Sequence, residues 1–269
     1  MVRKISVIIP TKNRHDFLEN ALKSFSQFID HVEIVVIDDG SSREQTSLNK
    51  SLCLTIPDCK YIYFPKSQGA AAARNQGLGI SYCDYIWFVD DDDFVPVEAI
   101  EDVSKLVSTP SFAGQAILLP MTLMSKKLIV RKIFPSPERN NFEKYRDIGH
   151  QVSTSAAIFS RKILQKVGGW DDSLAAGQDT DLFLRVSRLT NFQCLSTKPV
   201  IQNVGHYNRI TRAVLKQETG KIQFLIKHWK ILSNRRKIYY FLSFILVAPL
   251  LNEPNIYRIK VKLLRGYYR

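Results

Sequence analysis

The chain has 269 residues, of which 45% are hydrophobic, and this size suits one large domain or one domain with an appendage. Its four cysteines form no C-x-x-C pair and no cluster with histidine at zinc-ligand spacing, so we expect buried, reduced thiols rather than a zinc module. The formal net charge is +13, and residues 205–269 carry nearly all of it, with 14 lysines and arginines against 2 acidic residues. We therefore expect the C-terminal part to meet an anionic partner.

Short apolar runs in the N-terminal half are typical of buried parallel strands, and they cover residues 5–9, 33–37, 61–64 and 85–89. Between them, the spacing of apolar or small residues predicts helices over 16–28, after Ser41 or Ser42, over 69–81 and after Pro96. This alternation predicts an α/β fold with a doubly wound, mostly parallel sheet. From 111 to 202 the pattern is mixed, with strands expected at 117–119 and 155–159, helices at 161–167 and 179–189, and a mobile loop at 135–141.

Polar residues follow three of the predicted strands at the point where each strand ends. They are Thr11, Asn13 and Arg14 after the first strand, Asp38 and Asp39 after the second, and Asp90 to Asp93 after the fourth. Ligands of doubly wound sheets bind beyond the carboxyl ends of the strands. We therefore expect these side chains to meet at one edge of the sheet and to form a binding site there.

The run Asp90-Asp91-Asp92-Asp93 is the sharpest of these signals. Four adjacent carboxylates repel one another, so the end of a buried strand does not tolerate them without compensation. Mg²⁺ or Mn²⁺ supplies it, because these ions prefer oxygen ligands and are often held by one or two carboxylates together with substrate phosphates. A solvated acidic turn is the alternative interpretation.

Three further features carry candidate chemistry. Arg74 follows four alanines on a predicted helix; close packing explains the alanines, whereas the guanidinium is expected near carboxylates or a diphosphate. Asp179 stands at the start of a predicted helix, where acidic residues are favoured anyway, and it is also a candidate general base. His206 forms a small basic cluster with Arg209 and Arg212, which makes the three residues candidates for metal or phosphate contact.

In their order along the chain, five segments resemble family 2 glycosyltransferases, an inverting group with a GT-A fold. The segments are residues 7–14 (VIIPTKNR), 33–42 (EIVVIDDGSS), 73–77 (ARNQG), 88–93 (FVDDDD) and 168–182, which holds GGWDD and QDTDL. The resemblance covers about residues 5–212. One position departs from the family pattern: Gln178 stands where the family usually has glutamate, while Asp179 is kept.

The resemblance implies a nucleotide-sugar-binding half (residues 1–110), an acceptor-binding half of the same GT-A domain (111–213) and a basic helical tail (214–269). It implies a nucleotide-diphosphate sugar as donor, with UDP favoured, a glycan or lipid-linked acceptor, and Mn²⁺ or Mg²⁺ as cofactor. The implied donor-binding residues are Pro10, Thr11, Asn13, Arg14, Asp39, Arg74, Asp90, Asp91, Arg209 and Arg212, with Asp39 on the nucleobase. The implied metal ligands are Asp92, Asp90 and His206, and Asp179 is the implied base that takes the proton of the acceptor hydroxyl.

No apolar run with a cleavage site follows Met1, so we expect no secretory signal and a cytoplasmic location. The apolar stretch at 238–251 is too short to span a bilayer; we expect the tail to lie on the inner face of the plasma membrane, or alternatively to pack on the domain or on another subunit. The breadth of the family favours a role in bacterial surface polysaccharide synthesis. A nucleotidyltransferase and a non-catalytic nucleotide-sugar-binding subunit are the alternative functions, and we find no nucleic-acid-binding module.

Overall fold

The computed structural model of the chain describes residues 4–125, 128–150, 152–204 and 214–247. The chain divides into two compact units. The first comprises Met1–Tyr145, Gly149–Asp172 and Gln178–His206, and the second comprises Arg146–Ile148, Ser173–Gly177 and Tyr207–Arg269. The first unit contains the sheet and all of the predicted site residues that the structure describes.

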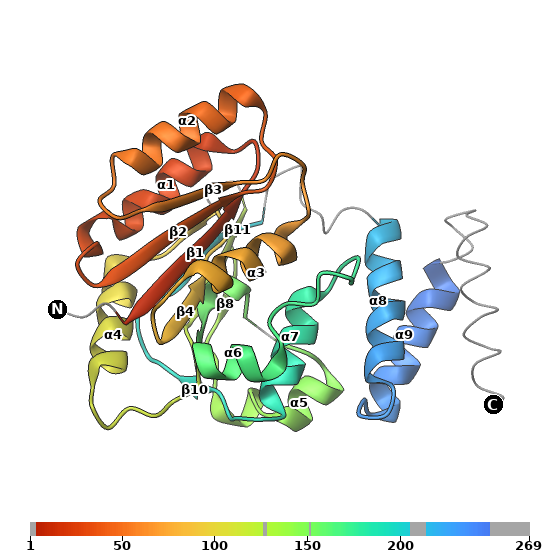
Figure 1. Ribbon diagram of the computed structural model, residues 1–269. Helices are drawn as coiled ribbons and strands as arrows, with labels where there is room; N and C mark the ends of the chain where they lie inside the picture. Colours follow the sequence, from red (N-terminus) through yellow and green to blue (C-terminus); the bar gives the residue numbers. More distant parts are fainter. Residues whose placement is uncertain (1–3, 126–127, 151, 205–213, 248–269) are drawn as a thin grey trace. The chain divides into compact units, whose positions relative to one another are not determined.

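A seven-stranded sheet forms the centre of the first unit (Figure 1). Its strand order is β10-β6-β9-β4-β1-β2-β3, and its strands are β1 (Ile5–Thr11), β2 (Val32–Asp38), β3 (Lys60–Tyr63), β4 (Tyr85–Phe88), β6 (Ala116–Leu118), β9 (Ala157–Ser160) and β10 (Gln193–Cys194). Strands β1 to β4 pair in parallel, and β9 is antiparallel to both β4 and β6. The predicted α/β fold with a mostly parallel sheet is therefore confirmed.

Helices cover both faces of this sheet. Helices α1 (His15–Phe25) and α2 (Arg43–Leu54) lie on one face, and α3 (Ala70–Ile80) lies on the other (Figure 1). This placement follows from the strand order, because right-handed crossovers put the helices of oppositely directed connections on opposite faces. The remaining helices of the first unit are α4 (Val97–Ser108), α6 (Arg161–Val167) and α7 (Gln178–Ser187).

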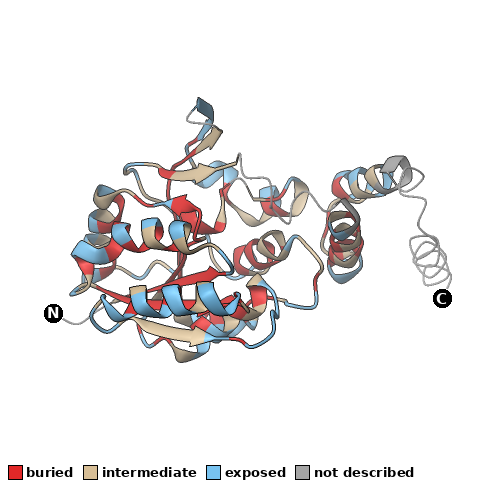
Figure 2. Cartoon of the chain, turned by 90° about the horizontal axis from the view of Figure 1, so that it is seen from above, coloured by how far each residue is buried: buried red, intermediate tan, exposed pale blue. Residues whose placement is uncertain are grey.

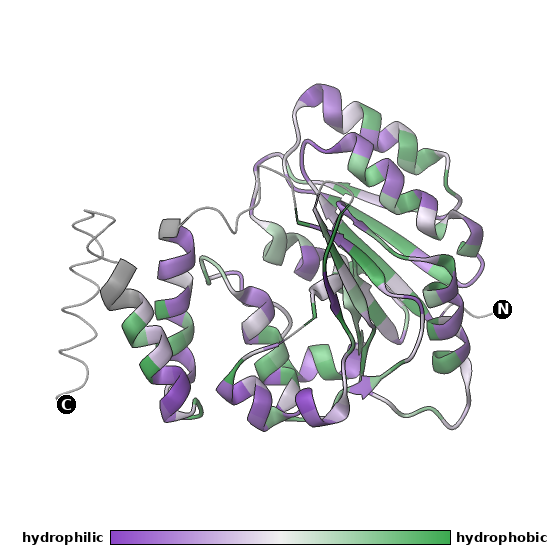
Figure 3. Cartoon of the chain, turned by 180° about the vertical axis from the view of Figure 1, so that it is seen from behind, coloured by the Kyte–Doolittle hydropathy of each residue, from purple (hydrophilic) through white to green (hydrophobic). Residues whose placement is uncertain are grey.

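The packing of α3 explains its small residues. Ala71 and Ala73 are buried against the sheet, and a Cβ atom added at Gly77 would lie 2.3 Å from Cγ2 of Ile8 on β1. No side chain fits at that separation, so glycine lets the helix approach the strand closely. Figures 2 and 3 show the result: the central strands are buried and apolar, while the outer faces of the covering helices are exposed and polar.

A second, four-stranded sheet was not predicted. Its order is β5-β11-β7-β8, and its strands are β5 (Asp93–Phe94), β11 (Val200–Asn203), β7 (Met121–Ser125) and β8 (Leu128–Ile133). Two of these strands are short, and β8 is exposed along most of its length, so it lacks the alternation that marks a half-buried strand. The sheet matters for the site because β5 begins inside the acidic run.

The segment 135–141, expected to be a loop, contains a short 3₁₀ helix (Pro137–Arg139) before α5 (Phe142–Asp147). Its Asn140 is buried, donates to the backbone oxygen of Ser136 at 2.8 Å and accepts from the hydroxyl of Tyr145 at 3.0 Å. Similar 3₁₀ turns cover Ser26–Phe28 after α1 and Thr154–Ala156 before β9. They explain why the predicted helix and strand boundaries at these places differ from the observed ones.

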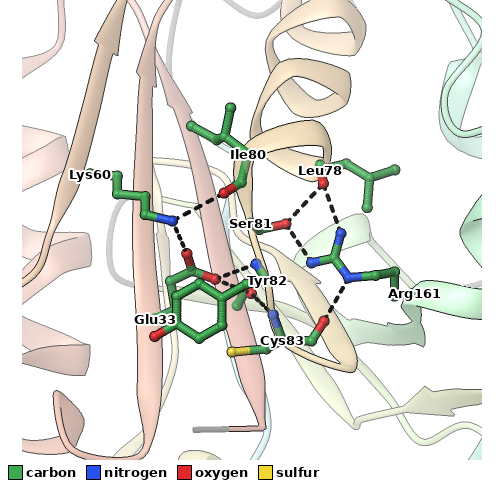
Figure 4. Close-up of polar contacts among 9 residues, drawn as sticks. Glu33, Lys60, Leu78, Ile80, Ser81, Tyr82, Cys83 and Arg161 are labelled. Atoms are coloured by element: carbon green, nitrogen blue, oxygen red, sulfur yellow. Dashed lines mark hydrogen bonds and ion pairs between the residues drawn. The ribbon is translucent and has the colours of Figure 1, made fainter.

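The amino ends of the strands are held by a polar network (Figure 4). Glu33, which is 1% exposed, accepts from Ser6, from the backbone N–H of Tyr82 at 2.9 Å and from Lys60 Nζ at 2.7 Å. Beside it, Arg161 donates to the backbone oxygens of Cys83 and Leu78, at 2.8 and 2.9 Å, and to the hydroxyl of Ser81, at 2.8 Å. The network fixes the turn between α3 and β4 at the end of the sheet that is remote from the predicted site.

The second unit contains α8 (Val214–His228) and α9 (Asn234–Val247). Arg236 of α9 is buried; it lies 4.9 Å from the ring of Phe224 on α8 and donates to the hydroxyl of Tyr240 at 3.1 Å. Gly220 of α8 packs closely on Ala176, since a Cβ atom there would lie 2.4 Å from its backbone oxygen. Within the described residues, no helix has the length and apolar character that crossing a bilayer requires.

Candidate functional site

The carboxyl ends of β1, β2 and β4 meet, as the polar residues after them predict. Thr11 ends β1 opposite Asp38, which ends β2, and the backbone N–H of Asp39 donates to the oxygen of Thr11 at 2.8 Å. Next along the sheet, Val89 follows β4 and donates to the oxygen of Ile8 at 3.0 Å. The loops that follow these strands therefore lie side by side at one edge of the sheet.

The loop after β1 partly neutralises the negative charge of the acidic run, Asp90 to Asp93. Asp91 is 5% exposed; it accepts from the hydroxyl of Thr11 at 2.7 Å and from Arg14 Nη1 at 3.1 Å. The same Arg14 nitrogen lies 3.5 Å from Oδ2 of Asp92. Burial raises the pKa of Asp91 to about 6, although Arg14 and Thr11 act in the opposite direction. Asp91 thus faces the protein and ties the loop after β1 to the loop after β4.

Arg74 on α3 compensates the first carboxylate of the run. Its guanidinium forms a salt bridge with Asp90, whose side chain is 31% exposed, and lies 4.6 Å from the centre of the Trp170 ring. Its Nε is buried without a hydrogen-bond partner among the described residues. Arg74 is therefore held between an aromatic ring and a carboxylate.

Asn75, next to Arg74, makes a pair of contacts that no sequence motif predicts. Its amide nitrogen donates to the backbone oxygen of Trp170 at 2.8 Å, and its amide oxygen accepts from the backbone N–H of Trp170 at 2.8 Å. A Cβ atom at Gly169 would lie 2.7 Å from that oxygen, and Gly169 has φ +68°. These contacts join the ARNQG and GGWDD segments, which lie almost a hundred residues apart, and they place the Trp170 ring over Arg74.

Asp39, the implied nucleobase contact, is 6% exposed and holds a protein loop. Its carboxylate accepts from the hydroxyl of Ser67 at 2.7 Å and from the backbone N–H groups of Gln68 and Gly69, at 2.6 and 2.9 Å. Gly40, with φ +79°, lets the chain pass this loop, because a Cβ atom there would lie 2.7 Å from the Ser67 nitrogen. The nucleobase role of Asp39 stays a prediction, and the observed contacts position the start of α3.

Two other residues that the resemblance implies for binding the nucleotide sugar also have structural roles. Pro10 is buried within β1, opposite Ile37 of β2. Asn13, with φ +53°, accepts from the backbone N–H of Ser42 at 2.7 Å, while its own N–H donates to the Ser41 hydroxyl at 2.8 Å. Together with the Ser42 side chain, which caps α2, Asn13 fixes the loop that carries Arg14.

Asp179 occupies the first turn of α7. Its Oδ1 accepts from the backbone N–H of Thr180 at 2.7 Å, and its Oδ2 lies 3.3 Å from Nε2 of His150. Burial acts to raise the pKa of Asp179, but the interactions with His150, the Thr180 N–H and the charge of Arg74 together hold it below its usual range. Asp179 is therefore ionised and able to accept a proton. No sequence motif marks His150, because it lies 29 positions before its partner Asp179.

Three of the predicted site residues lie outside the described residues: His206, Arg209 and Arg212. Among the residues that are described, no group of three histidine, cysteine, aspartate or glutamate side chains is arranged to hold a metal ion. The carboxylates of Asp90 and Asp92 are hard oxygen donors next to cationic side chains, which fits an ion held jointly with a diphosphate. They do not fit an ion held by the described protein side chains alone.

Comparison with known proteins agrees with this architecture. Residues 6–168 match the model of Glycosyl transferase family 2. WcaA of Escherichia coli, named as a glycosyl transferase of colanic acid biosynthesis, is 29% identical over 188 residues, which are 68% of this chain and 65% of that protein. In relatives that are 35% and 38% identical over 98 and 110 residues, the matched part covers 39% and 18% of the relative's length. The chain thus spans less than two thirds of the length of each of these three relatives.

Two solved structures share the fold. S. aureus TarS 1-349 in complex with UDP-GlcNAc superposes with a TM-score of 0.68 and 14% identity, covering 88% of this chain and 71% of that chain. The mannosyltransferase PcManGT of Pyrobaculum calidifontis, in complex with GDP-Man and Mn²⁺, superposes with a TM-score of 0.62 and 16% identity, covering 100% of this chain and 81% of that chain. At such low identity the likeness shows a GT-A fold and no more.

Proposed function

Because the chain belongs to glycosyl transferase family 2, we propose that it transfers a sugar from a nucleotide-diphosphate donor to a hydroxyl of a glycan or lipid-linked acceptor, with inversion. The observation that carries the proposal is the arrangement at the carboxyl edge of the sheet. There the acidic run meets two arginines: Arg14 pairs with Asp91 and Asp92, and Arg74 pairs with Asp90. Paired charges of this kind can exchange partners when a diphosphate and a cation bind together.

On the donor side, the guanidinium of Arg74 contacts a phosphate oxygen, and Asp39 binds the nucleobase. Arg209 and Arg212 contact the diphosphate. Asp92, Asp90 and His206 hold Mn²⁺ or Mg²⁺, which when bound stabilises the negative charge that develops on the leaving diphosphate. UDP is the nucleotide that we favour, and the structure of TarS with UDP-GlcNAc supports this choice. The mannosyltransferase was solved with GDP-Man and Mn²⁺, so the test includes both nucleotides.

On the acceptor side, Asp179 takes the proton of the attacking hydroxyl. Its ionised state and its 41% exposed side chain support this role, since a base must be both unprotonated and reachable. The attack proceeds in line with the departing diphosphate, so a single displacement inverts the anomeric carbon.

The setting that we propose is the assembly of a bacterial surface polysaccharide at the inner face of the plasma membrane. The name of WcaA supports the pathway class. The surface of α9 supports the membrane contact, because Ile238, Tyr239, Phe241 and Leu242 are exposed on a helix whose first turn carries Arg235 and Lys237. Flotation with liposomes rich in anionic lipid tests this: Phe241→Asp is expected to float less than the wild type, and equal flotation rejects the contact.

The activity itself is tested by incubating the chain with nucleotide sugars and Mn²⁺ and identifying the released nucleotide by mass spectrometry. Release of the nucleoside diphosphate, with the sugar on water or on an added acceptor, supports a glycosyltransferase. In a parallel incubation with a nucleoside triphosphate and a sugar phosphate, release of pyrophosphate would instead identify a nucleotidyltransferase. Binding of the donor without any release would identify a non-catalytic subunit.

A further inference from the structure

Three contacts fix the ring of His150 beside Asp179. Its Nδ1 lies 2.7 Å from the backbone oxygen of Val152, and its Nε2 lies 3.3 Å from Oδ2 of Asp179. Its ring stacks on the ring of Phe183, with 4.9 Å between the centres and 27° between the planes. Asp179 and Phe183 stand four residues apart on α7, so one face of this helix provides both the carboxylate and the aromatic support.

The acceptors determine where the protons lie. A backbone oxygen accepts but does not donate, so the proton in the contact with Val152 belongs to Nδ1 of His150. An unprotonated Nε2 would then turn its lone pair toward the lone pairs of Asp179, which is repulsive. A proton on Nε2 removes the conflict, and His150 then carries the positive charge that lowers the pKa of Asp179. The pair is an imidazolium against a carboxylate.

We infer that His150 is the positioning residue of the catalytic carboxylate: it fixes the orientation of Asp179 and keeps it ionised for the acceptor proton. This inference rests on the proposed role of Asp179 as the base. The burial of the two side chains supports this division of roles, since Asp179 is 41% exposed and His150 is 16% exposed. Both ring nitrogens of His150 face protein oxygens, whereas the carboxylate of Asp179 remains reachable.

Two other groups act on the same carboxylate. Arg74, on α3, contributes a positive charge, and the backbone N–H of Thr180 donates to the other carboxylate oxygen. Both remain when His150 is replaced. A glutamine at position 150 keeps a donor near the place of Nε2 but loses the charge, and a phenylalanine keeps the ring on Phe183 but loses both.

The test is a pH titration of the full chain labelled with ¹³C at the aspartate carboxyls, with the Asp179 signal identified by its loss in Asp179→Asn. We expect His150→Gln and His150→Phe to raise the pH at which Asp179 becomes protonated by about one unit or more, because they remove a neighbouring positive charge. His31→Gln, at a half-buried histidine before β2, is the control and is expected to leave it unchanged.

The second readout is the acid limb of the pH profile for hydrolysis of UDP-GlcNAc, with water as acceptor. We expect His150→Gln to move this limb to higher pH in parallel with the ¹³C titration, which a residue that only supports the fold would not do. An unmoved Asp179 titration in His150→Gln, with Asp179→Asn inactive, overturns the role of His150 and leaves the proposed function intact. A wild-type rate in Asp179→Asn would show that Asp179 is not the base, and it would exclude the positioning role of His150 as well.

Discussion

The guanidinium of Arg74 lies 4.6 Å from the centre of the Trp170 ring, so the ring and the salt bridge to Asp90 hold its plane from two sides. Arg74→Lys keeps the charge but loses the planar fork and the stacking. We expect it to weaken the binding of nucleoside diphosphates about 10-fold, which calorimetry measures. Arg188→Lys, at the exposed residue that follows α7, is the matched control. Equal affinities of both variants and the wild type would show that Arg74 does not contact the nucleotide.

Asp179→Asn removes the proposed base while keeping the size of the side chain. We expect the rate of sugar transfer to fall at least about 100-fold, because general base catalysis is lost, while the affinity for nucleotide stays the same. Asp172→Asn, a nearby exposed position, is expected to keep the wild-type rate. Parallel turnover and binding assays check both statements, and a rate near the wild type in Asp179→Asn would exclude it as the base.

Asp91 makes the free energy of unfolding of the metal-free protein depend on pH. Burial raises its pKa to about 6 in the folded chain, against about 3.9 in an unfolded chain. Between these values the folded state binds more protons, so the contribution of Asp91 to the free energy of unfolding decreases as the pH rises. We expect the wild type to lose about 2 kcal/mol relative to Asp91→Asn between about pH 4 and 6. Urea unfolding in EDTA measures this, and identical pH slopes in the two proteins would contradict it.

Arg161 stabilises the turn between α3 and β4 and lies away from the site (Figure 4). Arg161→Met keeps the aliphatic stem but leaves two backbone oxygens and a hydroxyl without their donor. We expect a loss of about 2–4 kcal/mol in the free energy of unfolding, with nucleotide affinity unchanged, because the network is at the opposite end of the sheet. Lys162→Met, at the next and exposed position, is the control. A change in affinity without a change in stability would reverse this assignment.

The first four strands and their helices could be predicted because apolar runs alternate with helical spacing, and their order determines where the loops meet. The four-stranded sheet could not, since β5 is two residues long and β8 shows no alternation. The residue types of the site could be predicted from the sequence, but the contacts between them could not. The partners Asn75 and Trp170 are separated by 95 positions, and only the folded chain brings them together. Asp39 shows the same limit, because its motif gives no sign that it holds the loop before α3.

The central claim is a metal-dependent site for a nucleotide-diphosphate sugar at the acidic run. Isothermal calorimetry with UDP, GDP, UDP-GlcNAc and GDP-mannose, with and without Mn²⁺, tests it most directly. We expect one nucleotide and its sugar to bind at least about 10-fold more tightly with Mn²⁺, and we expect Asp92→Asn to abolish this gain while Asp172→Asn keeps it. Absence of nucleotide binding with the metal present, or equal affinity with and without it in the wild type, would rule out a metal-dependent nucleotide-sugar site at the acidic run.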